Sequence, residues 1–158
     1  MTVAGGAAFG VALKLAMKSV VMPSLGAPPV NPAYQFLVGN AGATIEMLWV
    51  VVVAGGWGEE TLFRGYLFER LGKLLGESPW ARTAIVLLTS LVFGLLHLHD
   101  QGIAGAQQAT ITGLVFGAIF AATRRIWPLV FAHAAFDVTA VLIIYAGLER
   151  NVAHWFFH

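Results

Sequence analysis

The chain consists of long apolar runs separated by short polar or proline-rich segments. After a first run at residues 3–22, apolar stretches occupy residues 34–57, 80–98, 102–123 and 128–148. Each of these four is long enough to cross a bilayer as a helix at about 1.5 Å per residue. Residues 59–75 predict a further helix, which carries charges and ends before Gly76. The pattern predicts an all-α, polytopic transmembrane helical bundle with about five or six membrane helices.

The first run is the weakest of these segments. Lys14 and Lys18 interrupt it, and it ends at Met22-Pro23, after which the prolines at positions 28, 29 and 32 allow no helix to continue. Its amphipathic character predicts a segment that lies in the membrane interface or spans the membrane poorly. No cleavable signal peptide is expected, because the lysines fall inside the run and do not precede it.

Composition supports the membrane assignment. The 158 residues are 58% hydrophobic and 11% charged, with a mean hydropathy of +0.78, whereas soluble domains carry about a quarter charged residues. The absence of cysteine excludes disulfides, thiolate catalysis and cysteine metal sites. No basic stripe is present, so we expect no nucleic-acid partner. We expect one membrane domain, residues 1–158, with its motif-bearing core at about 50–145.

The distribution of basic residues predicts an orientation. If the last three spans alternate in direction, the loops at residues 70–82 and 124–125 lie on the same side, and both are rich in Lys and Arg. The loop at His99-Asp100 contains neither. The positive-inside rule therefore places the two basic loops in the cytoplasm, and the short, compact chain suggests a bacterial inner membrane.

A few ionisable residues fall within or beside the apolar spans, where they are costly and usually functional. Glu60 and Arg64 are four residues apart, in the favourable order for an ion pair on one helical face. Glu59 then remains as an unpaired carboxylate. His97 lies four residues after Phe93, and Asp137 lies four after His133. Because lipid offers no hydrogen bonds, these side chains must turn inward, which predicts a buried cluster of two carboxylates and two imidazoles from three helices.

This set of carboxylate and imidazole side chains indicates hydrolysis by an activated water molecule. A carboxylate can remove a proton from water, while imidazoles orient the water or donate to developing negative charge. No activated serine or threonine is indicated beside the histidines, and cysteine is absent, so a covalent nucleophile is not expected. The reaction class that fits is hydrolysis of an amide.

Three ordered motifs carry a family resemblance. Glu59-Glu60-x-x-x-Arg64, Phe93-x-x-x-His97 and His133-x-x-x-Asp137 resemble those of the CPBP family, which comprises CAAX prenyl proteases and bacteriocin-processing or immunity (Abi) membrane proteins. The likeness covers roughly residues 50–145. It implies an intramembrane endopeptidase, built as a helical bundle around a water-filled cavity, that acts on a membrane-associated peptide or prenylated protein near the cytoplasmic leaflet.

The resemblance also implies roles for single residues. Glu59 would activate the water with help from His97, and His133 with the residue at position 137 would stabilise the oxyanion. That last position is often Asn in the family, and an ionised Asp137 cannot donate a hydrogen bond. Glu60 is counted with the catalytic residues. Arg64 is assigned as the ion-pair partner of Glu60. Phe93 is expected mainly to pack against its neighbours, and a contact with the substrate is its second assignment.

Three alternatives stay open at this point. The protease could use zinc held by Glu59, His97, His133 and Asp137, although no dedicated metal motif occurs, and a mechanism that requires no cofactor is favoured. The protein could be a non-enzymatic bacteriocin-immunity or membrane partner protein that kept the fold. It could also relay protons as a transporter. Membrane lipid is the expected surrounding partner, and the sequence specifies neither the natural substrate nor the oligomeric state.

Overall fold

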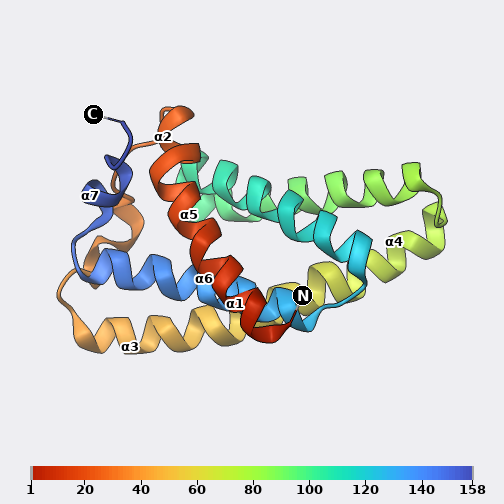
Figure 1. The fold of residues 1–158 in the computed structure, drawn as a ribbon, viewed down its shortest axis with the longest axis horizontal. Coiled ribbons are helices and arrows are strands. Elements are labelled where there is room, and N and C mark those ends of the chain that lie inside the picture. Colours follow the sequence, from red (N-terminus) through yellow and green to blue (C-terminus); the bar gives the residue numbers. More distant parts are fainter. Residues whose placement is uncertain (1, 158) are drawn as a thin grey trace.

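The computed structural model describes residues 2–157, and all regular structure in that range is helical. The helical elements in chain order are α1 (Val3–Ala16), η1 (Met17–Val21), α2 (Met22–Ser24), η2 (Pro32–Leu37), α3 (Ala41–Val50), η3 (Val51–Glu59), η4 (Thr61–Leu67), α4 (Phe68–Leu75), α5 (Pro79–Thr123), α6 (Trp127–Tyr145) and α7 (Glu149–Ala153). The predicted all-α fold class is confirmed, and Figure 1 shows the bundle.

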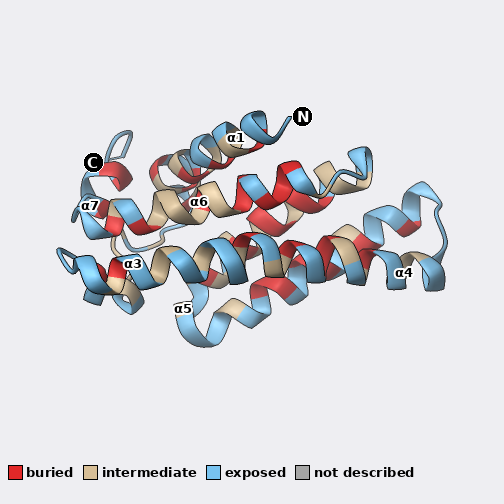
Figure 2. Cartoon of the chain, turned by 90° about the horizontal axis from the view of Figure 1, so that it is seen from below, coloured by how far each residue is buried: buried red, intermediate tan, exposed pale blue. Residues whose placement is uncertain are grey.

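Helix α6 is the central element of the bundle. Helix α1 packs against one side of it and η3 against another, and Figure 2 shows α6 between α1 and the helix that contains α3. The α1 contact depends on two glycines. A β-carbon at Gly6 would lie 2.2 Å from the carbonyl oxygen of Pro128, and one at Gly10 would lie 1.9 Å from that of Ala132. Only hydrogen on those α-carbons lets the two backbones come this close.

Residues 3–22, expected to lie in the interface or to span the membrane poorly, belong to a helix that is long and apolar enough to cross a membrane. The first helix runs without a break to Ser24 and packs along α6. Lys14 and Lys18, which gave the segment its amphipathic character, line a cavity inside the bundle. Sequence pattern could not show this, because a polar stripe on a helix can face an internal cavity as well as water.

Helix α5 folds back on itself as a hairpin. Gly102 breaks it with φ 67° and ψ −169°, a backbone conformation that is essentially limited to glycine. The two arms then pack closely. Positions for β-carbons at Gly113 and Gly117 lie 3.1 Å from the Ser90 Cα and 3.2 Å from a Val86 methyl group. The pair Gly113-x-x-x-Gly117 is thus a packing face, and two separate apolar spans are observed where the sequence predicts them.

The apolar run that ends at Trp57 and the charged helix after it form one continuous helix, Ala41–Leu75. Sequence analysis expected two elements with a boundary near Gly58. The glycine-rich stretch is instead accommodated by wider, π-helical turns in η3 and η4. Such turns occur often at functional sites, because they change the direction in which side chains project.

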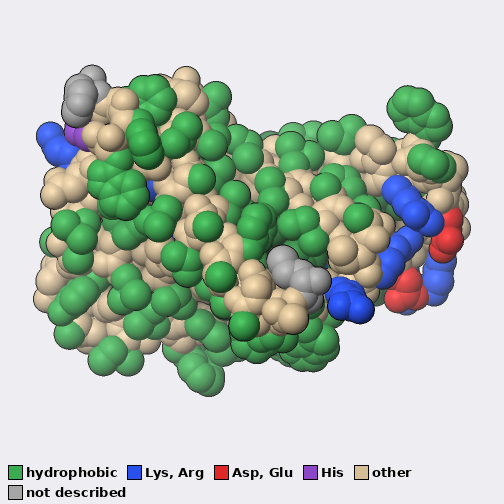
Figure 3. All heavy atoms as spheres, viewed as in Figure 1, with side chains coloured by type: hydrophobic (Ala, Val, Ile, Leu, Met, Phe, Trp, Pro, Cys, Tyr) green, Lys and Arg blue, Asp and Glu red, His purple; other side chains and the backbone are tan. Residues whose placement is uncertain are grey.

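Within residues 2–157, four helical segments are long and apolar enough to cross a membrane: Val3–Ser24, Ala41–Leu75, Pro79–Thr123 and Trp127–Tyr145. The kink at Gly102 divides the third of these into two arms. Large apolar side chains such as Trp49 and Trp80 lie on the outside, exposed by 72% and 85%. Figure 3 shows an apolar surface on which charged side chains gather mainly at one end of the long axis. This surface is suited to contact with lipid.

Candidate active site

The site begins with the close approach of η3 to α6. A β-carbon at Gly55 would lie 2.8 Å from Asp137 Oδ2, and one at Gly56 would lie 2.7 Å from the Ala134 β-carbon. Glycine at both positions lets the η3 backbone lie directly against α6. Since Glu59 follows within one turn, this packing carries its carboxylate to the face of α6 that bears His133.

Glu60 forms a fully buried bridge between Arg64 and His133. Its Oε1 atom accepts a hydrogen bond of 2.8 Å from Arg64 Nη1 and another of 2.8 Å from His133 Nδ1. Arg64 Nη2 also donates to the Gly113 carbonyl oxygen at 3.0 Å. The predicted Glu60–Arg64 pair is present, and it has a third member that helical spacing could not reveal. Because the carboxylate accepts, His133 Nδ1 carries a proton and Nε2 points away from Glu60.

The second nitrogen of His133 lies between two other carboxylates. Its Nε2 atom is 3.5 Å from Glu59 Oε2 and 3.5 Å from Asp137 Oδ2. The histidine side chain is 5% exposed, whereas those of Glu59 and Asp137 are 33% and 26% exposed. The ring is therefore held inside the bundle while both acids keep access to the cavity.

His97 reaches the same cavity from the first arm of α5. Its Nδ1 atom lies 2.8 Å from the Phe93 carbonyl oxygen. A carbonyl only accepts, so Nδ1 carries the proton and Nε2 of the neutral ring is free to accept one. The Phe93 ring lies against both imidazoles, with centroid distances of 4.6 Å to His97 and 5.9 Å to His133. The aromatic side chain thus packs between the two histidines, in agreement with its first assignment.

Both histidines lie against the Phe93 ring and line the same cavity, although their positions in the predicted spans suggest different depths. His97 falls late in its span and His133 early in the next, which predicts a backbone offset of about 10 Å. Figure 1 shows how the offset is closed: the connection from α5 turns back toward the middle of the molecule before α6 begins. Arg124 makes this turn with a φ of 54°. The depth of His133 in the bundle therefore depends on the three-residue connection between α5 and α6.

These side chains border a cavity of about 400 Å³. Glu59, His97, His133 and Asp137 line it, and so does Phe93. Glu60 and Arg64 do not line it, because they lie behind His133. The arrangement supports direct contact with a ligand for the first group and a positioning role for Glu60.

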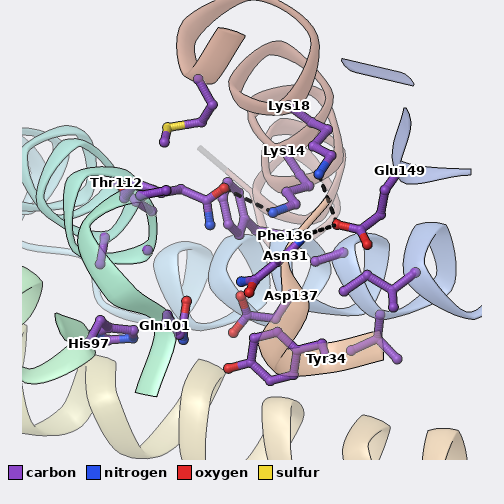
Figure 4. A pocket seen from close by; sticks show the side chains of 18 of the residues that line it. Lys14, Lys18, Asn31, Tyr34, His97, Gln101, Thr112, Phe136, Asp137 and Glu149 are labelled. Carbon is purple, nitrogen blue, oxygen red and sulfur yellow. Dashed lines mark hydrogen bonds and ion pairs between the residues drawn. The ribbon is translucent and has the colours of Figure 1, made fainter. Parts of the chain in front are cut away.

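The cavity also has a polar wall that sequence analysis did not assign to the site, formed by Lys14, Lys18, Asn31, Tyr34, Gln101, Gln108 and Glu149. Figure 4 shows Tyr34, Gln101 and Asp137 close together there. Burial and the negative charge of Asp137 raise the pKa of Tyr34 above its ordinary value of 10.0. The two lysines did carry a signal, since they interrupt an apolar run four residues apart and so share a helical face.

The candidate metal ligands do not form a metal site in the part of the chain that the structure describes. Within residues 2–157, no group of three or more His, Asp or Glu side chains is arranged so that it could hold a metal ion. His133 directs Nδ1 to Glu60, and its Nε2 lies 3.5 Å from the nearest oxygens of Glu59 and Asp137.

Comparison with known proteins gives one finding. The family model described as type II CAAX prenyl endopeptidase Rce1-like matches residues 41–139. This range is more than half of the chain and contains all three motifs, whereas α1 with Lys14 and η1 with Lys18 lie outside it. No curated protein and no solved structure matches the chain.

Proposed function

Because the chain belongs to the Rce1-like type II CAAX prenyl endopeptidase family, we propose that it is an intramembrane endopeptidase that cleaves by activated water. The family is one of proteases, and the apolar helices make this chain an integral membrane protein. The observation that carries the mechanism is the position of His133 Nε2, 3.5 Å from both the Glu59 and the Asp137 carboxylate in one cavity.

In the proposed reaction, Glu59 takes a proton from water, and the oxygen of that water attacks the carbonyl carbon of the scissile bond. His97, with Nδ1 fixed by the Phe93 carbonyl, directs Nε2 into the cavity to position the water. Protonated His133 donates from Nε2 to the oxyanion that forms. The C–N bond then breaks, and the proton held by Glu59 passes to the leaving amine, so that one water and one amide give an acid and an amine.

Asp137 contributes in one of two ways. Protonated, it would donate to the oxyanion directly. Ionised, it would hold the proton on His133 Nε2, which lies 3.5 Å away. Glu60 orients the same ring from the other nitrogen, so we place Glu60 among the positioning residues. No step in this proposed mechanism requires a metal.

We propose a peptide or prenylated protein in the membrane as the substrate and a bacterial inner membrane as the location. The cavity extends to the end of the bundle formed by residues 28–32 and Glu149. The exposed basic residues of the 70–82 loop lie toward the opposite end of the long axis (Figures 1 and 3). If the basic loops are cytoplasmic, the polar wall faces the other leaflet, and the expected cleavage near the cytoplasmic leaflet requires a substrate that enters sideways from the lipid.

The proposal is tested with purified protein in detergent and a fluorogenic, prenylated or lipid-anchored peptide. Glu59→Gln and His97→Gln should lower kcat at least about 100-fold, the range typical of general acid–base groups. Glu46→Gln and His154→Gln, at exposed positions outside the cavity, are the matched controls and should cleave at the wild-type rate.

Each other outcome has a defined meaning. Cleavage that survives Glu59→Gln would refute the glutamate mechanism. Loss of activity with a chelator, restored by zinc, would replace it with the metal-dependent alternative. No cleavage by the wild-type protein of any anchored peptide would favour a non-enzymatic membrane partner.

A further inference from the structure

A second cavity is bordered by both basic loops of the chain. It has a volume of about 270 Å³ and is lined by residues of η4, α4 and the two arms of α5. Figure 1 shows α4 and the start of α5 together at one end of the long axis, and Figure 3 shows charged side chains gathered at that end. None of the residues that line the proposed active site lines this second cavity.

The wall of the second cavity carries an excess of positive charge. Four basic side chains and two carboxylates line it: Arg64, Lys73, Arg82, Arg124, Glu69 and Glu77. Lys73 pairs with Glu69, and Arg82 Nη2 lies 4.0 Å from Glu77 Oε2. Among residues 2–157, no carboxylate oxygen lies within 4.0 Å of the Arg124 guanidinium. The cavity therefore has a free arginine available to bind an anion.

Arg124 occupies a backbone position that usually belongs to glycine. It ends α5 in the left-handed conformation, with φ 54° and ψ 25°, and its amide donates to the Phe120 carbonyl oxygen at 2.8 Å. Helices commonly end with glycine in this conformation, because a β-carbon there is strained. An arginine that costs stability at this point, and lines a cavity without an acidic partner, is in keeping with a ligand-binding position.

Arg64 adds a buried guanidinium to the same wall. It is 2% exposed, and its two terminal nitrogens donate to Glu60 and to the Gly113 carbonyl oxygen. Its Nε atom is buried and has no hydrogen-bond partner within residues 2–157. One donor of this guanidinium is thus unused by the protein. The second cavity and the Glu60–His133 bridge share this side chain.

The remaining surroundings match the headgroup region of a membrane. Phe68 and Phe120, with ring centroids 5.1 Å apart, form an apolar part of the wall. Trp80 lies two residues before Arg82 and Trp127 three residues after Arg124, and their side chains are 85% and 59% exposed. Exposed tryptophan beside arginine is typical of the membrane–water interface. The volume is slightly below the range of about 300–1,000 Å³ for small-molecule sites, which suits a headgroup and leaves the acyl chains in the bilayer.

We propose that the second cavity binds the phosphate of an anionic phospholipid. Arg124 and Arg82 donate to the phosphate oxygens at the exposed side, and Arg64 contributes positive charge from the buried side. Guanidinium groups bind phosphate with paired, charge-assisted hydrogen bonds. Anionic lipids are the negatively charged component of the cytoplasmic leaflet, the side on which the two basic loops are expected. This inference is independent of the proposed protease function, so it is tested without a substrate.

The test measures lipid binding to the purified full chain. Protein in neutral detergent is titrated with phosphatidylglycerol or phosphatidylcholine, and bound lipid is counted by native mass spectrometry. Wild type should bind phosphatidylglycerol at least about tenfold more tightly than phosphatidylcholine, because only the first has a net charge. Arg124→Gln should weaken phosphatidylglycerol binding about fivefold or more. Arg125→Gln is the matched control, since it removes the same charge from the adjacent exposed position, outside the cavity, and should bind as wild type does.

Two further variants separate a defined site from general attraction and from misfolding. Gly72 lines the cavity, and a β-carbon there meets no atom within 4 Å, so Gly72→Leu should fill the space and weaken binding about tenfold without changing the charge. Arg124→Gly should weaken binding while it raises the unfolding temperature by about 2–4 °C, because glycine relieves the backbone strain. Weaker binding by a more stable protein cannot result from unfolding.

Three results would overturn the proposal. Equal losses in Arg124→Gln and Arg125→Gln would show only diffuse attraction to the basic end of the bundle. Wild-type binding by Gly72→Leu would place the lipid outside the cavity. Displacement of the lipid by an equal concentration of inorganic phosphate would identify a site for free phosphate and not for a phospholipid.

Discussion

Glu60 is the residue at which structural and catalytic roles can be separated most sharply. It is 0% exposed, and its Oε1 atom accepts from Arg64 and from His133, each at 2.8 Å. Glu60→Met removes both bonds and leaves the Arg64 guanidinium, itself 2% exposed, without a carboxylate. Breaking a buried ion pair on one side costs about 3–5 kcal/mol. We expect a loss near the lower end of that range, because Arg64 keeps its bond to the Gly113 carbonyl and its contacts with two aromatic rings.

The double variant Glu60→Met/Arg64→Met removes the uncompensated charge. Replacing a buried ion pair by apolar side chains of similar volume is often close to neutral, so the unsatisfied Nδ1–H of His133 should account for most of the remaining cost, about 1–3 kcal/mol. The double variant should therefore be more stable than Glu60→Met alone. The stability loss of the double variant should therefore be smaller than the sum of the two single losses by about 2 kcal/mol.

Activity should follow a different order from stability. Arg64→Met leaves the Glu60–His133 hydrogen bond in place and should retain substantial activity. Glu60→Met and the double variant should both lose about 100-fold or more in kcat, because the imidazole loses the acceptor that fixes its tautomer and orientation. Stability is measured by denaturant titration in detergent with circular dichroism, and kcat with the anchored peptide. If the double variant recovered both stability and wild-type kcat, Glu60 would serve only to neutralise Arg64, and its assignment to His133 would be wrong.

Three further perturbations test other parts of the structure. Gly10→Ala places a methyl group 1.9 Å from the Ala132 carbonyl oxygen and should lower the unfolding free energy by about 1–3 kcal/mol. The control Gly72→Ala, in an open helical position, should raise the unfolding free energy by about 0.5–1 kcal/mol. Equal effects of the two variants in a denaturant titration would contradict the α1–α6 contact. Asp137→Asn keeps a side chain that can donate to an oxyanion, so it should retain at least tenfold more kcat than Asp137→Ala; equal loss would mean that the carboxylate charge itself is required. Glu149→Leu removes the acceptor shared by Lys18, Asn31 and Gln35 and should increase proteolysis and hydrogen exchange in residues 25–40, an effect that Glu46→Leu should not produce.

The arrangement of the motif residues illustrates what sequence pattern could and could not predict. Helical spacing predicted the Glu60–Arg64 pair, which the structure contains. It also predicted that Glu59 has no partner on its own helix, and its Oε2 atom lies 3.5 Å from His133 Nε2 on α6. The cost of placing polar groups in lipid required the ionisable side chains to meet. The bridge from Glu60 to His133 joins residues 73 positions apart, and no local rule relates them.

In the N-terminal helix, by contrast, the sequence did not predict which way the polar side chains face. The two lysines in its apolar run were visible in the sequence, but their direction was not. Whether Lys14 faces headgroups or a cavity depends on which face of α1 carries Gly6 and Gly10, and on the presence of a helix close enough to use them. Only the packing against α6 turned a segment that resembled an interfacial helix into one wall of the site.

By itself, the sequence determined that this chain is a helical membrane protein with acids and histidines turned inward, because apolar length, helical spacing and the cost of charge in lipid are local properties. The tertiary structure decided which nitrogen of His133 faces Glu60 and which faces the cavity, how the turn after α5 brings His97 and His133 together, and that Lys14 joins them. These features depend on contacts between backbones that glycine alone permits, and such contacts are set by the packing of whole helices.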